Sequence, residues 1–503
     1  MTWQHMGASL LLVFGLGGCT VGPNYHPPQV PVPATWSAGQ PGGAEAHAVM
    51  TAQWWTTFKD ALLESLIARA VQSNLELRTA AARVREARAQ RGVTAADLWP
   101  TINVSGSYTR QRSSANAFTL PSGAASSTAS GGGPSVTQEQ DLFQTGFDAS
   151  WEIDLFGGIR RSIEAADADL AASQEGLRDT LVSLLAEVAR NYIEVRGVQR
   201  RLAIAQENMT AQQETLELTR ARFEAGLTSE LDVVQAASQL ATTQSQLPAL
   251  ETSLQQGMHR LGVLIGQEPG ALLAELSTAA PIPAAPPDVP VGLPSELLRR
   301  RPDVRRAERQ LAAATARIGV AVADLFPRLS LTGALGLQSV TLTDLATVGS
   351  RFWSVGPALR WPLFQAGRIR ANIAVQGARE EQQLRTYEQT VLTSLEEVEN
   401  ALVAYSREQV RRARLAEAVE ANRRAVDLAN ELYLRGLGTF LNVLDSERAL
   451  FASQSDLAQS EATIATDIVA LYKALGGGWE TFVPTPEDQN TRAVASEKVR
   501  GDG

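Results

Sequence analysis

Two kinds of hydrophobic pattern alternate along this chain of 503 residues. In short segments of about ten residues, apolar side chains occupy every second position, whereas in long segments they recur every seven positions. A period of two predicts β-strands, because successive side chains of a strand point to opposite faces of its sheet. A period of seven predicts helices that pack against other helices along their whole length.

Four segments show the period of two, in the ranges 101–109, 143–153, 329–337 and 353–361. Segments of this length, apolar on one face and small or polar on the other, fit transmembrane β-strands. A soluble sheet with one wet face is the alternative source of such alternation. Aromatic residues near the segment ends favour the membrane, namely Tyr108, Phe143, Trp151, Trp353 and Trp361. Because the smallest barrels need about eight strands, several copies of the chain must share one barrel.

The period of seven recurs within two proline-free stretches, residues 157–247 and 363–483, and in the second stretch it is broken only by Arg412. One helix from Ile159 to Gly226 would be about 100 Å long, which no compact globular domain can hold. Gly226 and Gly436 interrupt the two patterns, and heptad spacing resumes after each glycine. The sequence therefore predicts two antiparallel helical hairpins.

The two halves of the chain repeat one structural unit. Residues 74–100 match residues 301–327, and both runs end in a similar motif, Asp97-Leu-Trp-Pro100 and Asp324-Leu-Phe-Pro327. Repeated motifs of this length indicate an internally duplicated architecture. A Ser-, Ala- and Gly-rich segment, residues 113–135, is an insertion in the first half and is predicted to be a loop between strands.

These patterns predict a mostly α-helical protein with a transmembrane β portion and an internal duplication. The first structural repeat covers residues 57–266, with a β-hairpin at about 101–153 followed by a long helical hairpin. A proline-rich linker, residues 267–293, leads to the second repeat, residues 294–478, with a β-hairpin at about 328–361. Residues 19–56 form an extended N-terminal arm, and residues 479–503 a polar, mobile C-terminal tail.

The N-terminus predicts a lipoprotein. Residues 1–18 carry no Asp, Glu, Lys or Arg, and their apolar run is too short to span a membrane, as in a signal peptide. Leu16-Gly-Gly-Cys19 resembles the bacterial lipobox, which implies cleavage before Cys19 and acylation of its thiol, with palmitate among the acyl chains. Cys19 is the only cysteine, so no internal disulfide can form. A chance cysteine beside an ordinary cleavage site is the alternative.

Charge and motif content argue against several functions. The net charge is −9 without a basic patch, which gives no support for nucleic-acid binding. The four histidines are scattered, and no pair has metal-ligand spacing. No phosphate loop or nucleophile motif is present. We therefore expect no enzyme activity, no catalytic residue, no metal and no cofactor.

Several motifs together resemble TolC-type outer membrane efflux lipoproteins of the NodT class. They are the lipobox followed by Val21-Gly-Pro-Asn-Tyr25, the pair Trp54-Trp55, the run Leu-Pro-Ser-Glu-Leu-Leu-Arg-Arg-Arg-Pro-Asp at 293–303, and Leu-Gly-Gly-Gly-Trp at 475–479. The resemblance implies a homotrimer in the outer membrane lipid. Each chain would contribute four strands to a 12-stranded β-barrel, which a long α-helical coiled-coil barrel would continue across the periplasm.

The same resemblance implies a function and partners. The trimer would passively conduct drugs or other small toxic solutes to the exterior. It would receive them from a periplasmic adaptor (membrane fusion) protein and an inner-membrane pump, commonly of the resistance-nodulation-division type. Two alternatives remain open: a channel for protein or polysaccharide secretion, and a trimeric scaffold lipoprotein that merely spans the envelope.

By resemblance, a periplasmic gate lies near the two glycine turns. Asp445 is the expected acidic position at the closed entrance, and its repeat counterpart is the neutral Gln235. The family often has a second acidic residue one turn earlier, but this chain has Asn442. Tyr433 and Asp232 are expected to form a hydrogen bond between helices.

The spacing of the same residues allows a simpler role. Ser229 and Asp232 have capping-box spacing, as do Thr439 and Asn442, so Asp232 is a candidate for helix capping as well as for gating. The small residues of the turns would let a partner helix approach closely, which makes the turns candidates for adaptor docking. These residues are Gly226, Leu227, Thr228, Ser229, Gly436, Leu437, Gly438 and Thr439.

Overall fold

The computed structural model describes residues 20–37, 52–112, 139–284 and 292–481. The predicted signal peptide, the lipidation site Cys19 and the segment 482–503 of the predicted tail lie outside these residues. The chain forms two compact units. Of the described residues, one unit contains those within 20–26, 87–170 and 311–383, and the other contains those within 27–86, 171–310 and 384–481.

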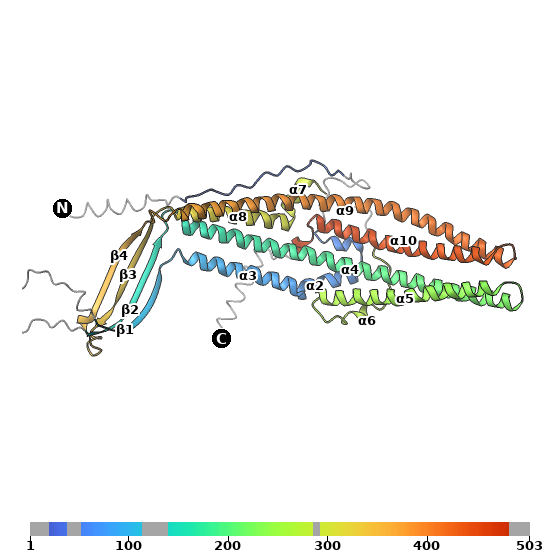
Figure 1. Ribbon diagram of the computed structural model, residues 1–503, viewed down its shortest axis with the longest axis horizontal. Coiled ribbons are helices and arrows are strands. Elements are labelled where there is room, and N and C mark those ends of the chain that lie inside the picture. The colour runs from blue at the N-terminus through green and yellow to red at the C-terminus, as the bar shows by residue number, and fades with distance from the viewer. Residues whose placement is uncertain (1–19, 38–51, 113–138, 285–291, 482–503) are drawn as a thin grey trace, which may run out of the picture. The chain divides into compact units, whose positions relative to one another are not determined.

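The first unit contains one antiparallel sheet of four strands in the order β1-β2-β3-β4 (Figure 1). The strands are β1 (Thr101–Arg112), β2 (Glu139–Ile153), β3 (Arg328–Ser339) and β4 (Arg351–Arg360). They fall on the four alternating segments, except that Trp361 lies just beyond the end of β4. Thus the period of two identified the strands of both halves, and the two hairpins join into one sheet through β2 and β3.

The backbones of β2 and β3 approach closely at one point, where each strand has a glycine. Gly146 of β2 lies opposite Gly336 of β3. A Cβ atom on Gly146 would stand 2.6 Å from the carbonyl oxygen of Leu335, and one on Gly336 would stand 2.4 Å from the carbonyl oxygen of Thr145. Any side chain at these positions would therefore force the two central strands apart.

Two long helical hairpins carry the heptad pattern (Figure 1). The first consists of α4 (Gly158–Glu224) and α5 (Glu230–Leu264), and the second of α9 (Arg368–Leu434) and α10 (Phe440–Ala474). The outgoing helices have 67 residues each and the returning helices 35 each, so the duplication is also visible in element length. Among the described helices, none contains a stretch apolar enough to cross a bilayer.

Shorter helices complete the two repeats. They are α2 (Ala61–Ser73), α3 (Leu75–Ala96), α6 (Leu273–Leu276), α7 (Pro294–Arg300) and α8 (Pro302–Ala323). Short 3-10 helices cover Trp54–Phe58 (η2), Val348–Ser350 (η3) and Trp479–Thr481 (η4).

The predicted tail begins too early at residue 479. Trp479 packs against the main hydrophobic core, and the guanidinium carbon of Arg178 lies 4.6 Å from the centre of its ring. The indole nitrogen of Trp479 also donates to the carbonyl oxygen of Arg300 at 3.3 Å. Trp479 therefore belongs to the folded body of the second repeat.

The main core lies in the second unit, where the hairpins meet η2 and α2. Trp54 stacks on Tyr472 of α10, with ring centroids 5.1 Å apart. Asp60 caps α2 by accepting hydrogen bonds from the amides of Leu62 and Leu63, and it also accepts from the hydroxyl of Tyr192 on α4 at 2.7 Å. One acidic side chain thus joins the entry of the fold to a long helix.

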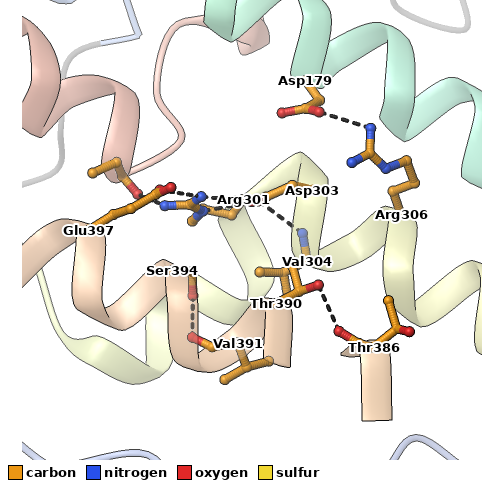
Figure 2. A network of polar contacts seen from close by, with 11 residues as sticks. Asp179, Arg301, Asp303, Val304, Arg306, Thr386, Thr390, Val391, Ser394 and Glu397 are labelled. Carbon is orange, nitrogen blue, oxygen red and sulfur yellow. Dashed lines mark hydrogen bonds and ion pairs between the residues drawn. The ribbon is translucent and has the colours of Figure 1, made fainter. Parts of the chain in front are cut away.

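In the arginine-rich motif at 293–303, the guanidinium of Arg301 lies beside the carboxylates of Asp303 and Glu397 (Figure 2). Arg301, between α7 and α8, is 7% exposed and donates to the carbonyl oxygen of Ala474 at 2.8 Å. Its guanidinium also pairs with Asp303 at 2.6 Å and with Glu397 of α9 at 2.7 Å. Burial alone would raise the pKa of Asp303, but the hydrogen bonds and charge of Arg301 outweigh burial and lower this pKa.

Candidate functional site

The two turns that join the long helices have the same geometry. Gly226 and Gly436 both have φ of +73°, a conformation that costs any residue with a side chain about 1–2 kcal/mol. Leu227 N–H donates to the carbonyl of Arg222 at 2.8 Å, and Leu437 N–H donates to that of Leu432 at 2.9 Å. This is the Schellman arrangement, in which a left-handed glycine lets the chain satisfy the last helical carbonyls. The backbone geometry therefore explains why a glycine ends each of the two long helices, as the sequence predicted.

The capping boxes suggested by residue spacing are not formed. Ser229 and Thr439 are N-cap residues with extended backbones, but neither side chain accepts a capping hydrogen bond. The carboxylate of Asp232 instead accepts a hydrogen bond from the hydroxyl of Thr228. Asp232 lies in the first turn of α5, where its negative charge favours the positive end of the helix.

The expected hydrogen bond between Tyr433 and Asp232 is also absent within this chain. Tyr433 is 5% exposed, and its hydroxyl has no hydrogen-bond partner among the described residues. The ring of Tyr433 packs on Phe440, with centroids 5.6 Å apart. It belongs to a small apolar cluster that contains residues of all four long helices, Leu216, Ala236, Ala429, Tyr433, Phe440, Val443 and Leu444. Tyr433 therefore joins the two hairpins by packing.

Arg222 of α4 reaches the second hairpin at the same point. Its guanidinium carbon lies 4.7 Å from the centre of the Tyr433 ring, within the range of a cation–π interaction. Its Nη1 donates to the carbonyl of Leu434, the last residue of α9, at 3.3 Å. Since a cation at a helix C-terminus is electrostatically favourable, Arg222 stabilises the end of α9 while it contacts Tyr433.

Further polar contacts join the hairpins above the turns, and two of them involve neighbouring residues of α10. Arg448 of α10 donates to the side-chain oxygen of Gln239 on α5 at 2.6 Å. Thr215 of α4 donates to the carboxylate of Glu447 on α10 at 2.9 Å. Burial raises the pKa of Glu447, and the Thr215 hydrogen bond offsets this shift only in part. These side chains hold α4 and α5 against α10 near the predicted gate.

Asp445 and Asn442 lie on a more open surface of α10. Both residues are exposed, and the side chain of Asp445 is 65% exposed. Asp445 is 3.9 Å from Arg448, a distance at which an exposed ion pair contributes little. Gln235 is half-buried on α5. The carboxylate of Asp445 is thus exposed in the single chain.

The tips of the hairpins carry exposed apolar side chains. Leu227 is 66% exposed and Leu437 is 74% exposed, each next to its turn glycine. A Cβ atom added at Gly226 or Gly436 would meet no atom within 4 Å, so space does not restrict these positions. Both turns therefore present a small residue followed by a leucine to the outside.

The sequence interpretation missed Arg222, Arg448 and Glu447. In the second repeat the counterpart of Arg222 is Leu432, so a comparison of the two halves does not single out the charge. Glu447 and Arg448 stand among other charged heptad positions and become distinctive only through their partners on other helices. Their roles depend on packing between segments far apart in sequence.

Comparison with known proteins agrees with this architecture. The family model described as "Outer membrane efflux protein" matches residues 66–267 and 293–477. The chain is 33% identical to Nodulation protein T of Rhizobium leguminosarum bv. trifolii over 467 residues, covering 92% of this chain and 95% of the relative. It is 34% identical to the solvent efflux pump outer membrane protein SrpC of Pseudomonas putida, covering 92% and 96%.

A solved structure gives the same result. The outer-membrane channel OprN is 38% identical to the chain, with a TM-score of 0.83, covering 92% of this chain and all of OprN. The chain therefore belongs to the outer membrane efflux protein family. It has the fold of TolC-like channels, and it is an efflux channel of the outer membrane whose helical barrel lies in the periplasm. The resemblance seen in the motifs is thus confirmed.

Proposed function

We propose that three copies of this chain form one conduit, the outer membrane component of a tripartite pump that exports small toxic solutes. A periplasmic adaptor and an inner-membrane pump of the resistance-nodulation-division type would supply the solutes. The N-terminal Cys19 would anchor each copy through its acyl chains. The names of two relatives, a solvent efflux pump outer membrane protein and an antibiotic efflux pump outer membrane protein, support a small apolar or amphipathic cargo.

The open sheet is the observation that carries this proposal. In the described residues β1 pairs only with β2 and β4 only with β3, so both outer strands have one unpaired edge. Large apolar side chains of the sheet are exposed, for example Val104, Trp353 and Leu359. Within a bilayer every backbone polar group must be paired, which requires a closed barrel. Edge-to-edge pairing of β4 with β1 of the next copy would close twelve strands.

The proposed gate lies at the hairpin tips. Three copies of Asp445 around one axis would repel each other and attract cations at the periplasmic entrance. Asn442, Gln235 and Tyr433 would line or support the same constriction, and Asp232 would act there through its contact with Thr228. The Arg222 contact with Tyr433 would keep the two hairpins of each copy together in the closed state.

The adaptor would dock on the turns. Gly226 to Ser229 and Gly436 to Thr439 expose backbone and two leucines at the end of the hairpins. An adaptor helix with small or apolar residues would fit such a surface, because the glycines allow close approach. The two turns have equal backbone conformations, so the trimer would offer six similar docking points.

Native mass spectrometry and planar-bilayer conductance of the purified acylated protein test the proposal together. We expect a trimer with a mass shift for three acylated Cys19 residues and a small single-channel current. Monomers in detergent and bilayers would contradict the shared barrel. Stable trimers with no current under any gate substitution would favour the scaffold alternative.

Docking needs its own experiment. Single cysteines at Thr228 and Thr439 can be crosslinked to a cognate adaptor, because acylated Cys19 offers no competing thiol. A matched cysteine at Thr210, exposed on α4 away from the turns, is the control. Crosslinks at Thr210 with none at the turns would contradict docking at the tips.

A further inference from the structure

Arg161, near the start of α4, holds the backbone of the segment that follows the predicted lipidation site. It is 3% exposed, although arginine is rarely buried without partners. Its guanidinium donates to the carbonyl of Val21 at 3.1 Å, to that of Gly22 at 3.3 Å and to the side-chain oxygen of Asn24 at 2.7 Å. One buried cation thus binds three acceptors, on Val21, Gly22 and Asn24, within residues 20–24, which we call the docked segment.

Glycines make room for the docked segment on both sides. A Cβ atom at Gly22, whose φ is +87°, would stand 2.5 Å from the Cα of Gly319 on α8. A Cβ atom at Gly157, with φ of +80°, would stand 2.8 Å from the Cα of Thr20. The segment therefore lies in direct backbone contact with the start of α4 and with α8, and each contact needs a glycine.

A backbone hydrogen bond ties the docked segment to the end of the sheet. Val21 N–H donates to the carbonyl of Phe156, three residues beyond the end of β2, at 3.1 Å. Phe156 stacks on Phe326 of the Asp-Leu-Phe-Pro motif, with centroids 4.7 Å apart. The segment is thus attached where the strands of the sheet give way to helices.

Two tryptophans mark the same level of the fold in both repeats. The indole nitrogen of Trp151 donates to the carbonyl of Leu98 at 2.9 Å, and that of Trp361 donates to the carbonyl of Leu325 at 3.0 Å. These four residues are counterparts in the internal duplication. Both indoles remain substantially exposed, as is typical of tryptophan at a membrane–water interface.

We propose that Arg161 is a positioning residue for the lipid anchor: it fixes the docked segment so that acylated Cys19 enters the inner leaflet at the level of Trp151 and Trp361. The inference rests on the proposed lipidation of Cys19. Consecutive Cα atoms are about 3.8 Å apart across a trans peptide, so fixing Thr20 would keep the lipid-bearing residue before it near the docked segment. The partner surface is the phospholipid headgroup layer at the periplasmic boundary of the outer membrane.

Limited chymotrypsin digestion of the full-length acylated trimer tests the contact of Arg161. Cleavage after Tyr25 releases a lipid-linked peptide that mass spectrometry detects. We expect Arg161→Gln to accelerate this release about tenfold or more, because hydrogen bonds from a charged donor contribute about 1.5–3 kcal/mol to local stability. Arg317→Gln, which removes an exposed ion pair with Asp169 in the same unit, is the matched control. Equal release rates in wild type and Arg161→Gln would overturn the proposal.

Gly22→Ala provides a second variant that leaves Arg161 and the helices intact. Its methyl group would clash with Gly319, so it should also accelerate the release of the peptide. If Arg161→Gln fails to fold, Gly22→Ala still tests the proposal. Release of the peptide at the wild-type rate would then show that docking of residues 20–24 does not hold the lipid anchor in place.

Spin labels measure the depth of the docked segment in the membrane. We expect a label on Pro23→Cys and a label on Trp99→Cys, next to Leu98, to report the same headgroup depth in phospholipid vesicles. A Pro23→Cys label in bulk water would overturn the membrane level. Failure of lipidation itself is seen separately, as a free Cys19 thiol that reacts with maleimide; the protease test of Arg161 then follows the unacylated peptide that ends at Tyr25.

Discussion

The guanidinium of Arg222 lies 4.7 Å from the centre of the Tyr433 ring and donates a hydrogen bond to the carbonyl of Leu434. This contact joins the end of α4 in the first hairpin to the end of α9 in the second. The ends of α4 and α9 are equivalent in the duplicated architecture, yet the position of Arg222 is occupied by Leu432 in the second repeat. At their tips, two otherwise similar hairpins are therefore joined by an asymmetric contact.

Loss of this contact should loosen the gate. We expect Arg222→Gln to raise the single-channel open fraction about fivefold, because a cation–π contact of about 1 kcal/mol changes an equilibrium by that factor. Planar-bilayer recording measures the effect, and Arg220→Gln, an exposed arginine on the same helix, is the control. An Arg222→Gln channel with wild-type open fraction would show that the hairpins do not separate here.

Two substitutions of Tyr433 distinguish the effect of packing from that of hydrogen bonding. Its hydroxyl has no partner among the described residues, whereas its ring lies in the apolar cluster with Phe440. We therefore expect Tyr433→Phe to conduct like the wild type and Tyr433→Ala to open more often. The same recordings decide the point. If Tyr433→Phe opens as often as Tyr433→Ala, the hydroxyl has a partner on a neighbouring subunit.

Asp445 and Asn442 should set the response to cations. We expect Asp445→Ala to raise the concentration of a trivalent cation needed for half-block from the periplasmic side about tenfold, since three charges leave the entrance. Asn442→Asp should lower that concentration, because it adds a charge one turn away on the same exposed surface. A half-block concentration unchanged by both substitutions would remove α10 from the entrance.

The long elements could be predicted from the sequence because their signals repeat. A heptad sustained over many turns, such as that from Leu181 to Phe223, has only one regular interpretation, and a left-handed turn such as that at Gly226 strongly favours glycine. Four alternating segments likewise identified four strands. The duplication strengthened each prediction, since both halves showed the same pattern.

The individual contacts could not be predicted in the same way. Asp232 was expected to meet Tyr433, but Thr228 is only four residues away and satisfies the carboxylate locally. Arg222 gives no periodic signal, and its role depends on the distance between two hairpins. The contacts of Arg161 likewise form only because residues 20–24 lie against α4.

Arg301 and Arg306 lie five residues apart in the chain but should differ in their effect on stability. Arg301 is buried and bonds Asp303, Glu397 and the end of α10, whereas Arg306 pairs with Asp179 on a half-exposed surface. We expect Arg301→Met to lower the free energy of unfolding by about 3 kcal/mol, because it leaves buried polar groups unpaired. Arg306→Met should cost about 0–1 kcal/mol. Thermal unfolding of the detergent-solubilised trimers makes the comparison, and equal melting temperatures would contradict it.

Asp467 of α10 should make the periplasmic helices sensitive to pH. Burial, and secondarily the charge of Glu408, raise its pKa from 3.8 to about 6, and its Oδ2 has no hydrogen-bond partner among the described residues. The folded state thus holds this proton more tightly than the unfolded chain does. Stability should therefore fall as the pH rises from about 4 to about 6 and then remain level.

The neutral variant Asp467→Asn removes this penalty. A shift of about two pKa units corresponds to nearly 3 kcal/mol, but Asp467 is partly exposed, and screening reduces the expected gain to about 1 kcal/mol. The variant trimer should melt at a higher temperature than the wild type near pH 7.5, and the difference should shrink towards pH 4. Asp456→Asn, an exposed position on the same helix, controls for the loss of charge. A difference that stays constant with pH would show that Asp467 does not titrate in this range, since only protonation of the wild-type carboxylate can abolish it.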